Sequence, residues 1–191
     1  MGRAELKKAA VPQVKASSRI KDMNIGIDIG YFFFQDALFQ EAYDKKTQNI
    51  RGEFAFRLPV PVDNFDIWTA VSRYSKDAKT SLYGEGLNYK TTTFSIAVRY
   101  LRKINIFTPF VGVGLDYISY KETYPKDFPI SSIGGSKTGY HLQGGAYIHI
   151  IPSISGKIQI RYLTAKALED GITVNLGGVE YSIGLNFHFD L

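Results

Sequence analysis

Apolar and polar residues alternate with a period of two along most of the chain after residue 23. In the segment 24–33 the apolar side chains share one parity, as Ile25, Ile27, Ile29, Tyr31 and Phe33, and small or polar residues hold the other. Successive side chains of a β-strand point to opposite faces of the sheet, so this pattern predicts a strand with one apolar face.

The same alternation recurs in six further segments, at 50–58, 93–100, 109–117, 140–150, 154–162 and 179–189. An eighth segment, 65–74, is less regular. Ile67, Thr69 and Val71 can share its apolar face, or Trp68 and Tyr74 can occupy that face instead. The sequence therefore predicts eight strands and leaves the register of the third one open.

The connections between the predicted strands alternate in length. Short turns rich in turn-forming residues lie at 58–64, 101–104 and 151–153, and long polar connections lie near 35–48, 75–87, 121–137 and 165–177. Short turns at one end and long loops at the other are typical of barrels that cross the bacterial outer membrane.

Two kinds of barrel fit this alternation, because periodicity does not say which face is outside. A lipocalin-like soluble barrel turns the apolar face inward, whereas a membrane barrel turns it toward lipid. The polar face here consists mainly of Gly, Ser, Ala, Thr and Asn with isolated charges of both signs, which suits the narrow interior of an eight-stranded barrel. A charge on the lipid face near mid-bilayer costs about 2–4 kcal/mol, and the apolar face is almost free of charge.

Aromatic residues lie toward the ends of the predicted strands, where membrane barrels carry an interfacial girdle. They are Tyr31, Phe33, Tyr100, Phe107, Tyr117, Tyr140, Tyr162, Phe187 and Phe189. We therefore predict an all-β fold: an eight-stranded antiparallel up-and-down transmembrane β-barrel.

The composition agrees with one membrane barrel domain over residues 23–191. No stretch approaches the roughly 18 apolar residues of a spanning helix, and the absence of cysteine excludes disulfides and thiolate chemistry. The net charge of +5 is concentrated in residues 1–22, which we expect to form a disordered basic tail. The remainder is near neutral, so nucleic-acid binding is not expected. No secretory signal is recognisable, and we expect that an export signal has been removed.

Three segments resemble the small outer-membrane β-barrels of the OmpA/OmpX type, also called porin-like β-barrel proteins. They are Phe65–Trp68 with the following Tyr74, Phe107–Tyr117 and Gly177–Phe189. The last resembles the closing strand that the outer-membrane assembly machinery reads, although this chain ends on Leu191 where the family usually ends on an aromatic residue. The resemblance implies the bacterial outer membrane as location, and outer-membrane lipid, lipopolysaccharide and the assembly machinery as partners.

Charged residues on the polar parity form the candidate site. They are Asp28, Arg51, Glu53, Arg57, Arg99, Asp116, Lys157, Arg161 and Glu180. Buried charges are tolerated when they are paired and hydrogen-bonded, so we interpret this set as an ion-pair network that fills the lumen. The alternative interpretation is a gated conduction path that opens when one pair breaks.

The three histidines, His141, His149 and His188, are the other chemical candidates. Resemblance to lipid A-modifying barrels suggests a His/Ser/acid site, but the spacing provides no convincing nucleophile, base and acid. Scattered histidines also make no sensible metal site, and the paired glycines lack the strand-to-helix context of a phosphate loop. We predict no catalytic residue, cofactor or metal.

The predicted function is therefore that of a monomeric, non-enzymatic outer-membrane protein with a filled interior. Its structural or interaction role would lie in the long loops, of which 121–130 combines charges, aromatic residues and prolines. A narrow channel for small solutes, a lipid A-modifying enzyme and a soluble ligand-binding barrel remain the alternatives.

Overall fold

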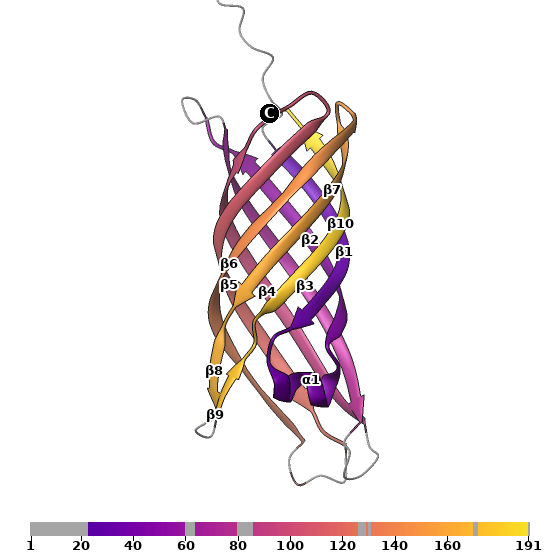
Figure 1. Ribbon diagram of the computed structural model, residues 1–191, viewed down its shortest axis with the longest axis vertical. Coiled ribbons are helices and arrows are strands. Elements are labelled where there is room, and N and C mark those ends of the chain that lie inside the picture. The colour runs from indigo at the N-terminus through magenta and orange to yellow at the C-terminus, as the bar shows by residue number, and fades with distance from the viewer. Residues whose placement is uncertain are drawn as a thin grey trace, which may run out of the picture.

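Eight long antiparallel strands close into a barrel in the computed structural model (Figure 1). The structure describes residues 23–59, 64–79, 86–125, 129, 131–169 and 172–190, and the predicted basic tail at 1–22 lies outside them. The barrel strands are β1 (Met23–Phe34), β2 (Lys46–Arg57), β3 (Phe65–Lys79), β4 (Gly86–Leu101), β5 (Phe107–Thr123), β6 (Ser132–Ile151), β7 (Ile154–Thr164) and β10 (Gly178–Phe189). Each strand pairs with its neighbours in the chain, and β10 pairs with β1, from Met23↔Phe189 to Phe34↔Gly178. The predicted fold class is confirmed.

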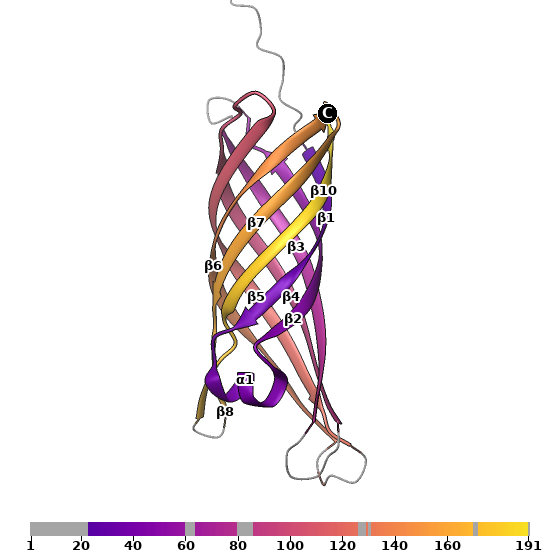
Figure 2. The same ribbon diagram turned by 45° about the vertical axis from the view of Figure 1, so that its right-hand side comes forward.

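Two small elements that the alternation did not predict lie in the long connections. The helix α1 (Ala37–Tyr43) follows β1, and a two-stranded sheet of β8 (Lys166–Glu169) and β9 (Ile172–Asn175) precedes β10. Both lie at the same end of the barrel, opposite the C-terminus and the short turns (Figure 2). Among the described residues, no helix is long and apolar enough to cross a membrane.

The second and third long connections are shorter than predicted, because the strands on either side continue beyond the apolar region. The ladder between β5 and β6 runs out to Thr123↔Ser132, and the ladder between β3 and β4 runs out to Lys79↔Gly86. Both faces of these extensions are polar at many positions, so the alternation that identifies a strand in sequence disappears. At the opposite end, Asn105 has a positive φ of 54° and turns the chain tightly between Ile104 and Phe107.

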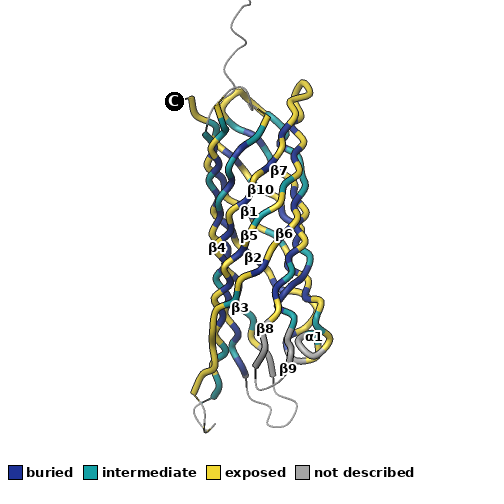
Figure 3. The backbone as a smooth tube through the Cα atoms, turned by 90° about the vertical axis from the view of Figure 1, so that its left-hand side faces the viewer, coloured by how far each residue is buried: buried dark blue, intermediate teal, exposed yellow. Residues whose placement is uncertain are grey.

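Burial along each strand has the opposite sense to that of a soluble barrel. Inward side chains are mostly polar and buried, and outward side chains are apolar and exposed, as the alternating colours along the tube show (Figure 3). The third strand has the first of the two possible registers: Trp68 and Tyr74 are buried inside, and Val71 faces outward. The outer wall is therefore a continuous apolar surface.

Aromatic side chains border this outer surface at both ends. Tyr31, Phe33, Tyr117, Tyr140, Tyr162 and Tyr181 lie outward toward the long-loop end, and Tyr100, Phe107, Phe187 and Phe189 lie outward toward the short-turn end. Aromatic rings favour the interface between hydrocarbon and headgroups, so their positions mark the two edges of a membrane-spanning region.

Gly145 supports close packing inside the wall. A Cβ atom at this position would lie 2.2 Å from the carbonyl oxygen of Ile158 and 2.6 Å from the ring of Phe110. We expect Gly145→Ala to lower the free energy of unfolding by about 1–3 kcal/mol, as overpacking does. Gly156→Ala is the control, because a Cβ there meets nothing within 4 Å. Urea titration of both variants in detergent checks this, and equal midpoints for the two variants would contradict it.

Candidate functional site in the barrel lumen

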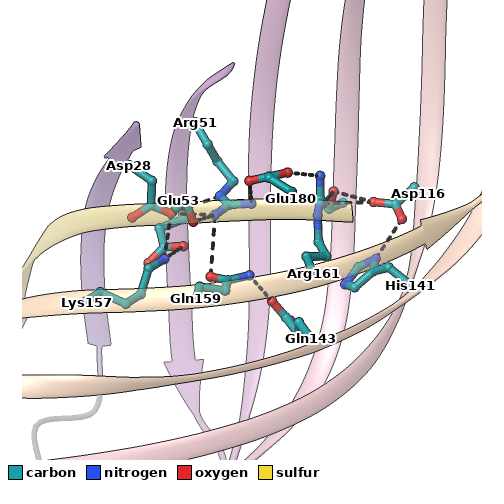
Figure 4. A network of polar contacts seen from close by, with 12 residues as sticks. Asp28, Arg51, Glu53, Asp116, His141, Gln143, Lys157, Gln159, Arg161 and Glu180 are labelled. Atoms are coloured by element: carbon teal, nitrogen blue, oxygen red, sulfur yellow. Dashed lines mark hydrogen bonds and ion pairs between the residues drawn. The ribbon is translucent and has the colours of Figure 1, made fainter. Parts of the chain in front are cut away.

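The middle of the barrel is filled by charged side chains that are almost completely buried. Five carboxylates face four cations: Asp28, Glu53, Asp66, Asp116 and Glu180, with Arg51, Arg99, Lys157 and Arg161. Because inward positions alternate along every strand, the barrel directs these groups to one axis. Figure 4 shows all of them except Asp66 and Arg99 where they meet across the lumen.

Arg51 on β2 lies at the centre of the arrangement. Its Nε and Nη2 donate to Asp28 Oδ2 on β1 at 2.9 and 2.8 Å, and its Nη1 donates to Glu180 Oε1 on β10 at 2.6 Å. Nη2 also donates to the Ser182 hydroxyl at 2.7 Å. Charge-assisted hydrogen bonds of this kind are stronger than neutral ones, so the guanidinium ties three neighbouring strands together.

Lys157 on β7 reaches across the lumen and contacts carboxylates on β1 and β2. Its ammonium donates to Asp28 Oδ2 at 2.6 Å and also to Glu53 Oε2 on β2. Glu53 accepts two further hydrogen bonds, from Trp68 Nε1 at 2.8 Å and from Asn186 Nδ2 at 2.6 Å. A carboxylate with this many donors satisfies its lone pairs without water, as a buried charge requires.

Arg161, also on β7, extends the network toward the long-loop end. Its Nη2 donates to Glu180 Oε2 at 2.8 Å, and its Nη1 donates to Ser95 Oγ at 2.9 Å and Asp116 Oδ1 at 3.3 Å. Asp116 Oδ2 lies 2.7 Å from His141 Nδ1. Ser95 belongs to β4, so Arg161 connects opposite walls of the barrel.

A second ion pair lies nearer the short-turn end. Arg99 donates to both carboxylate oxygens of Asp66, at 2.9 and 2.6 Å. The carbon of its guanidinium lies 4.8 Å from the ring centroid of Phe110 and 5.6 Å from that of Tyr147, within the range of cation–π attraction. Leu101 packs with these two rings to form an apolar layer on the short-turn side of the charges.

An aromatic and aliphatic cluster fills the lumen at the long-loop end. It consists of Phe32, Phe34, Tyr43, Tyr74, Leu87, Tyr89, Ile118, Tyr120, Leu163, Ala165 and Leu176. The Tyr43 hydroxyl, at the end of α1, donates to the Glu122 carboxylate on β5. Burial and this hydrogen bond raise the pKa of Tyr43, so the hydroxyl remains protonated and holds α1 against the mouth of the barrel.

Every barrel strand contributes to one connected network of side chains. Its members include, in chain order, Asp28, Arg51, Glu53, Trp68, Ser95, Asp116, His141, Gln143, Lys157, Gln159, Arg161, Glu180, Ser182 and Asn186. Apolar clusters lie in the lumen on either side of this network.

The structure joins seven of the nine charged residues that the sequence pointed to in one network, and an eighth, Arg99, lies in the lumen paired with Asp66. Arg57 is the exception, because it occupies the last position of β2 at the short-turn end and is partly exposed. Asp66, His141 and Trp68 were not included in the predicted network. The parity of Asp66 and Trp68 could not be assigned while the register of the third strand was open, whereas His141 already lay on the polar parity.

Two of the three histidines, His149 and His188, contact a hydroxyl, and His141 contacts a carboxylate. Asp116 lies between Ser95 and His141 and bonds to both, so the imidazole does not contact the hydroxyl that it would need to activate. A direct Ser–His contact does occur at the short-turn end, where Ser155 Oγ is 2.7 Å from His188 Nε2. Ser155 is fully buried, however, and leaves no position for a substrate. In the described part of the chain, no group of acidic and imidazole side chains is suited to a metal ion.

An apolar outer wall, a polar lumen and two aromatic borders define a transmembrane β-barrel of the bacterial outer membrane. The chain belongs to the outer membrane protein beta-barrel domain family, whose model matches residues 9–189. The short-turn end, which also carries the paired ends of β1 and β10, is accordingly the periplasmic end, and the long-loop end is extracellular.

Solved outer-membrane barrels share this fold at low sequence identity. Neisserial surface protein A is 14% identical with a TM-score of 0.68, covering 87% of this chain and 97% of its own. OprG from Pseudomonas aeruginosa is 11% identical with a TM-score of 0.65, covering 90% and 97%. Ail of Yersinia pestis, in complex with a heparin analogue, is 13% identical with a TM-score of 0.56, covering 88% and 99%. A comparison with curated protein sequences gave no match.

Proposed function

We propose that this protein is a non-enzymatic, non-conducting barrel that anchors a structured extracellular end in the outer membrane. The observation that carries the proposal is the contact of Arg51 and Arg161 with Glu180, which joins a chain of ion pairs reaching from wall to wall. A solute crossing the lumen would have to separate buried, hydrogen-bonded charges, which costs several kcal/mol for each pair broken.

The extracellular end supports an interaction role. Tyr43 fixes α1 against β5, and the β8–β9 hairpin extends the barrel wall between β7 and β10. Loops held on a rigid scaffold are the usual carriers of recognition, because the scaffold reduces the ordering cost of binding.

We further propose that the protein acts as a monomer delivered by the outer-membrane assembly machinery. The closed barrel has no unpaired strand edge that a second copy could extend. The closing strand β10 presents Tyr181, Ile183, Leu185, Phe187 and Phe189 outward, so one apolar stripe is available for that machinery to recognise.

Conductance in planar lipid bilayers tests the closed lumen. We expect no steady current from the wild-type protein at moderate voltage, because the ion pairs and the two apolar layers block the axis. Arg161→Ala removes one wall-to-wall link and is expected at most to produce brief, small openings. A steady current of large-porin size from the wild type would overturn the proposal. Small, reproducible steps from the wild type would instead support the narrow channel.

A further inference from the structure

Two half-buried histidines contact each other at the periplasmic end of the barrel. His149 lies near the end of β6 and His188 near the end of β10, and their ring centroids are 5.2 Å apart. Each ring contacts a buried hydroxyl: Thr108 Oγ1 lies 2.9 Å from His149 Nε2, and Ser155 Oγ lies 2.7 Å from His188 Nε2. His149 and His188 are called the periplasmic histidine pair below.

The backbone of both histidines holds the periplasmic turns. His149 N donates to Ile106 O at 2.8 Å, in the turn between β4 and β5, and His188 N donates to Ser153 O at 2.9 Å, in the turn between β6 and β7. The ladder between β6 and β7 is irregular here, with a register shift between His149 and Ile151. Such an irregularity interrupts the ladder locally, so displacement of either ring would loosen the turn that its backbone holds.

The pair also borders the apolar layer at this end of the lumen. The His188 ring packs edge-on against the Tyr147 ring, with centroids 5.7 Å apart, and Tyr147 packs with Leu101 and Phe110. The position of His188 therefore affects how well this layer is covered on its periplasmic side.

The described charges around the pair are mainly positive. Lys103, in the turn after β4, and Arg57, at the end of β2, bring their positive charges close to the His149 ring. The described carboxylates at this end are Asp190, exposed after β10, and Asp66, which is already in a buried ion pair. A positive charge on either imidazole would therefore be added to surroundings that are already cationic.

Protonation would change the interaction between the two rings. Histidine ordinarily changes its charge between pH 5 and pH 8. A hydroxyl can donate to a neutral imidazole or accept from a protonated one, so both hydroxyl contacts are compatible with either state. Two imidazolium ions in this contact would repel each other, and separation of the rings relieves that repulsion. The separated arrangement consequently takes up two protons more readily, and by linkage the closed arrangement is lost as the pH falls.

We propose that the periplasmic histidine pair is a pH-sensitive switch, closed at neutral pH and opened in mild acid when both rings are protonated. Opening releases the two turns that contain Ile106 and Ser153 and uncovers the apolar layer around Tyr147. The ion pairs in the middle of the barrel remain in place. The inference goes beyond the proposed function, since it concerns the response of the periplasmic end to acid and depends neither on the extracellular loops nor on conduction.

Amide hydrogen exchange of the full-length, refolded protein in detergent micelles, measured by NMR, tests the proposal. The reporters are the amides of residues 149 and 188, whose hydrogen bonds hold the two turns. After correction for the intrinsic exchange rate, their protection is expected to fall about tenfold between pH 7.5 and pH 5.5, since two like charges this close repel strongly enough at a partly exposed site. The amides of Val113 and Ile183, in the middle of the wall, are expected to keep their protection within twofold.

H149Q and H188Q each remove one of the two titrating rings and retain a side chain that can bond to the facing hydroxyl. In both variants protection at the reporters is expected to stay within twofold between the two pH values. K90Q, which removes an exposed cation at the extracellular end, is the matched control and is expected to retain the tenfold loss. Heat-modifiable migration on gels verifies folding, and H149N or H188N replaces a glutamine variant that does not fold.

Unchanged protection of the wild type at both pH values would overturn the proposal. A tenfold loss that persists in H188Q would overturn it as well, because one imidazolium beside Lys103 and Arg57 would then be sufficient and the pair would have no role. An equal loss at Val113 and Ile183 would show that acid loosens the whole barrel, which would also contradict a switch at the periplasmic end.

Discussion

Arg51→Ala is expected to destabilise the folded barrel by about 3–5 kcal/mol, the usual cost of removing one partner of a buried ion pair. The substitution leaves Asp28 and Glu180 buried without the guanidinium that bonds to both of them. It also removes the link between β2 and β10 across β1. Urea titration in detergent micelles, followed by circular dichroism and heat-modifiable migration, measures the change in the free energy of unfolding.

Arg57→Ala is the matched control on the same strand. Arg57 faces the periplasmic mouth and is partly exposed, so its loss is expected to cost less than about 1 kcal/mol. Equal destabilisation by the two substitutions would show that the central position of Arg51 has no special importance. It would also show that the buried side chains of the lumen do not stabilise the barrel as one network.

Val113→Arg is expected to lower the free energy of unfolding in lipid vesicles by about 2–4 kcal/mol, because it places a charge on the lipid face near mid-bilayer. Val113 lies between the border residues Phe107 and Tyr117 on β5, is 59% exposed and points away from the lumen. Urea titration of vesicle-embedded protein, followed by tryptophan fluorescence from Trp68, measures the effect. The penalty should shrink in short-chain detergent, where water reaches the side chain more easily.

Ser119→Arg provides the depth control for this prediction. Ser119 is also exposed and faces outward on β5, but it lies beyond Tyr117 toward the extracellular end, opposite Thr92, where the cost is expected to fall to about 0–1 kcal/mol. If arginine were tolerated equally at both positions, the apolar wall would not be facing hydrocarbon, and the soluble-barrel alternative would regain support.

The architecture could be predicted because each of its causes is local. Alternation specifies which residues share a face. The short turns, which contain proline or asparagine, identify the strand ends that lie at one end of the barrel. The register of the third strand could not be fixed in this way, since Trp68 and Tyr74 are as apolar as the outward residues Ile67 and Val71. Trp68 is buried inside because its indole N–H needs the Glu53 carboxylate, and that contact joins positions 15 residues apart.

The extracellular elements were less predictable for a different reason. The ladder that continues to Thr123↔Ser132 is held by backbone hydrogen bonds between polar segments, and β-strands outside a bilayer need no apolar face. The helix α1 is only seven residues long and is held in place by the distant Glu122 through Tyr43. A helix this short depends on such tertiary contacts for stability, and they leave no trace in the local sequence.

The lumen network was predictable from local sequence in one respect and not in another. The inward parity of Asp28, Arg51 and Glu180 was readable, because charges are excluded from the lipid face. Their pairing was not readable, because Arg161 reaches Ser95 and Lys157 reaches Glu53 across the barrel rather than along it. The pairing depends on barrel diameter and strand stagger, which only the closed structure specifies.

Site-specific labelling tests most directly whether an outward apolar wall surrounds a lumen filled by side chains. The chain has no cysteine, so a thiol reagent labels only the single cysteine that each substitution introduces. In lipid vesicles, Leu115→Cys and Ile183→Cys carrying a fluorophore are expected to be quenched by brominated acyl chains. Ser95→Cys and Ser182→Cys are expected to resist a water-soluble thiol reagent until the protein is denatured. Rapid aqueous labelling at Ser95 and Ser182 would contradict the filled lumen, and loss of lipid quenching at Leu115 and Ile183 would contradict the membrane-facing wall.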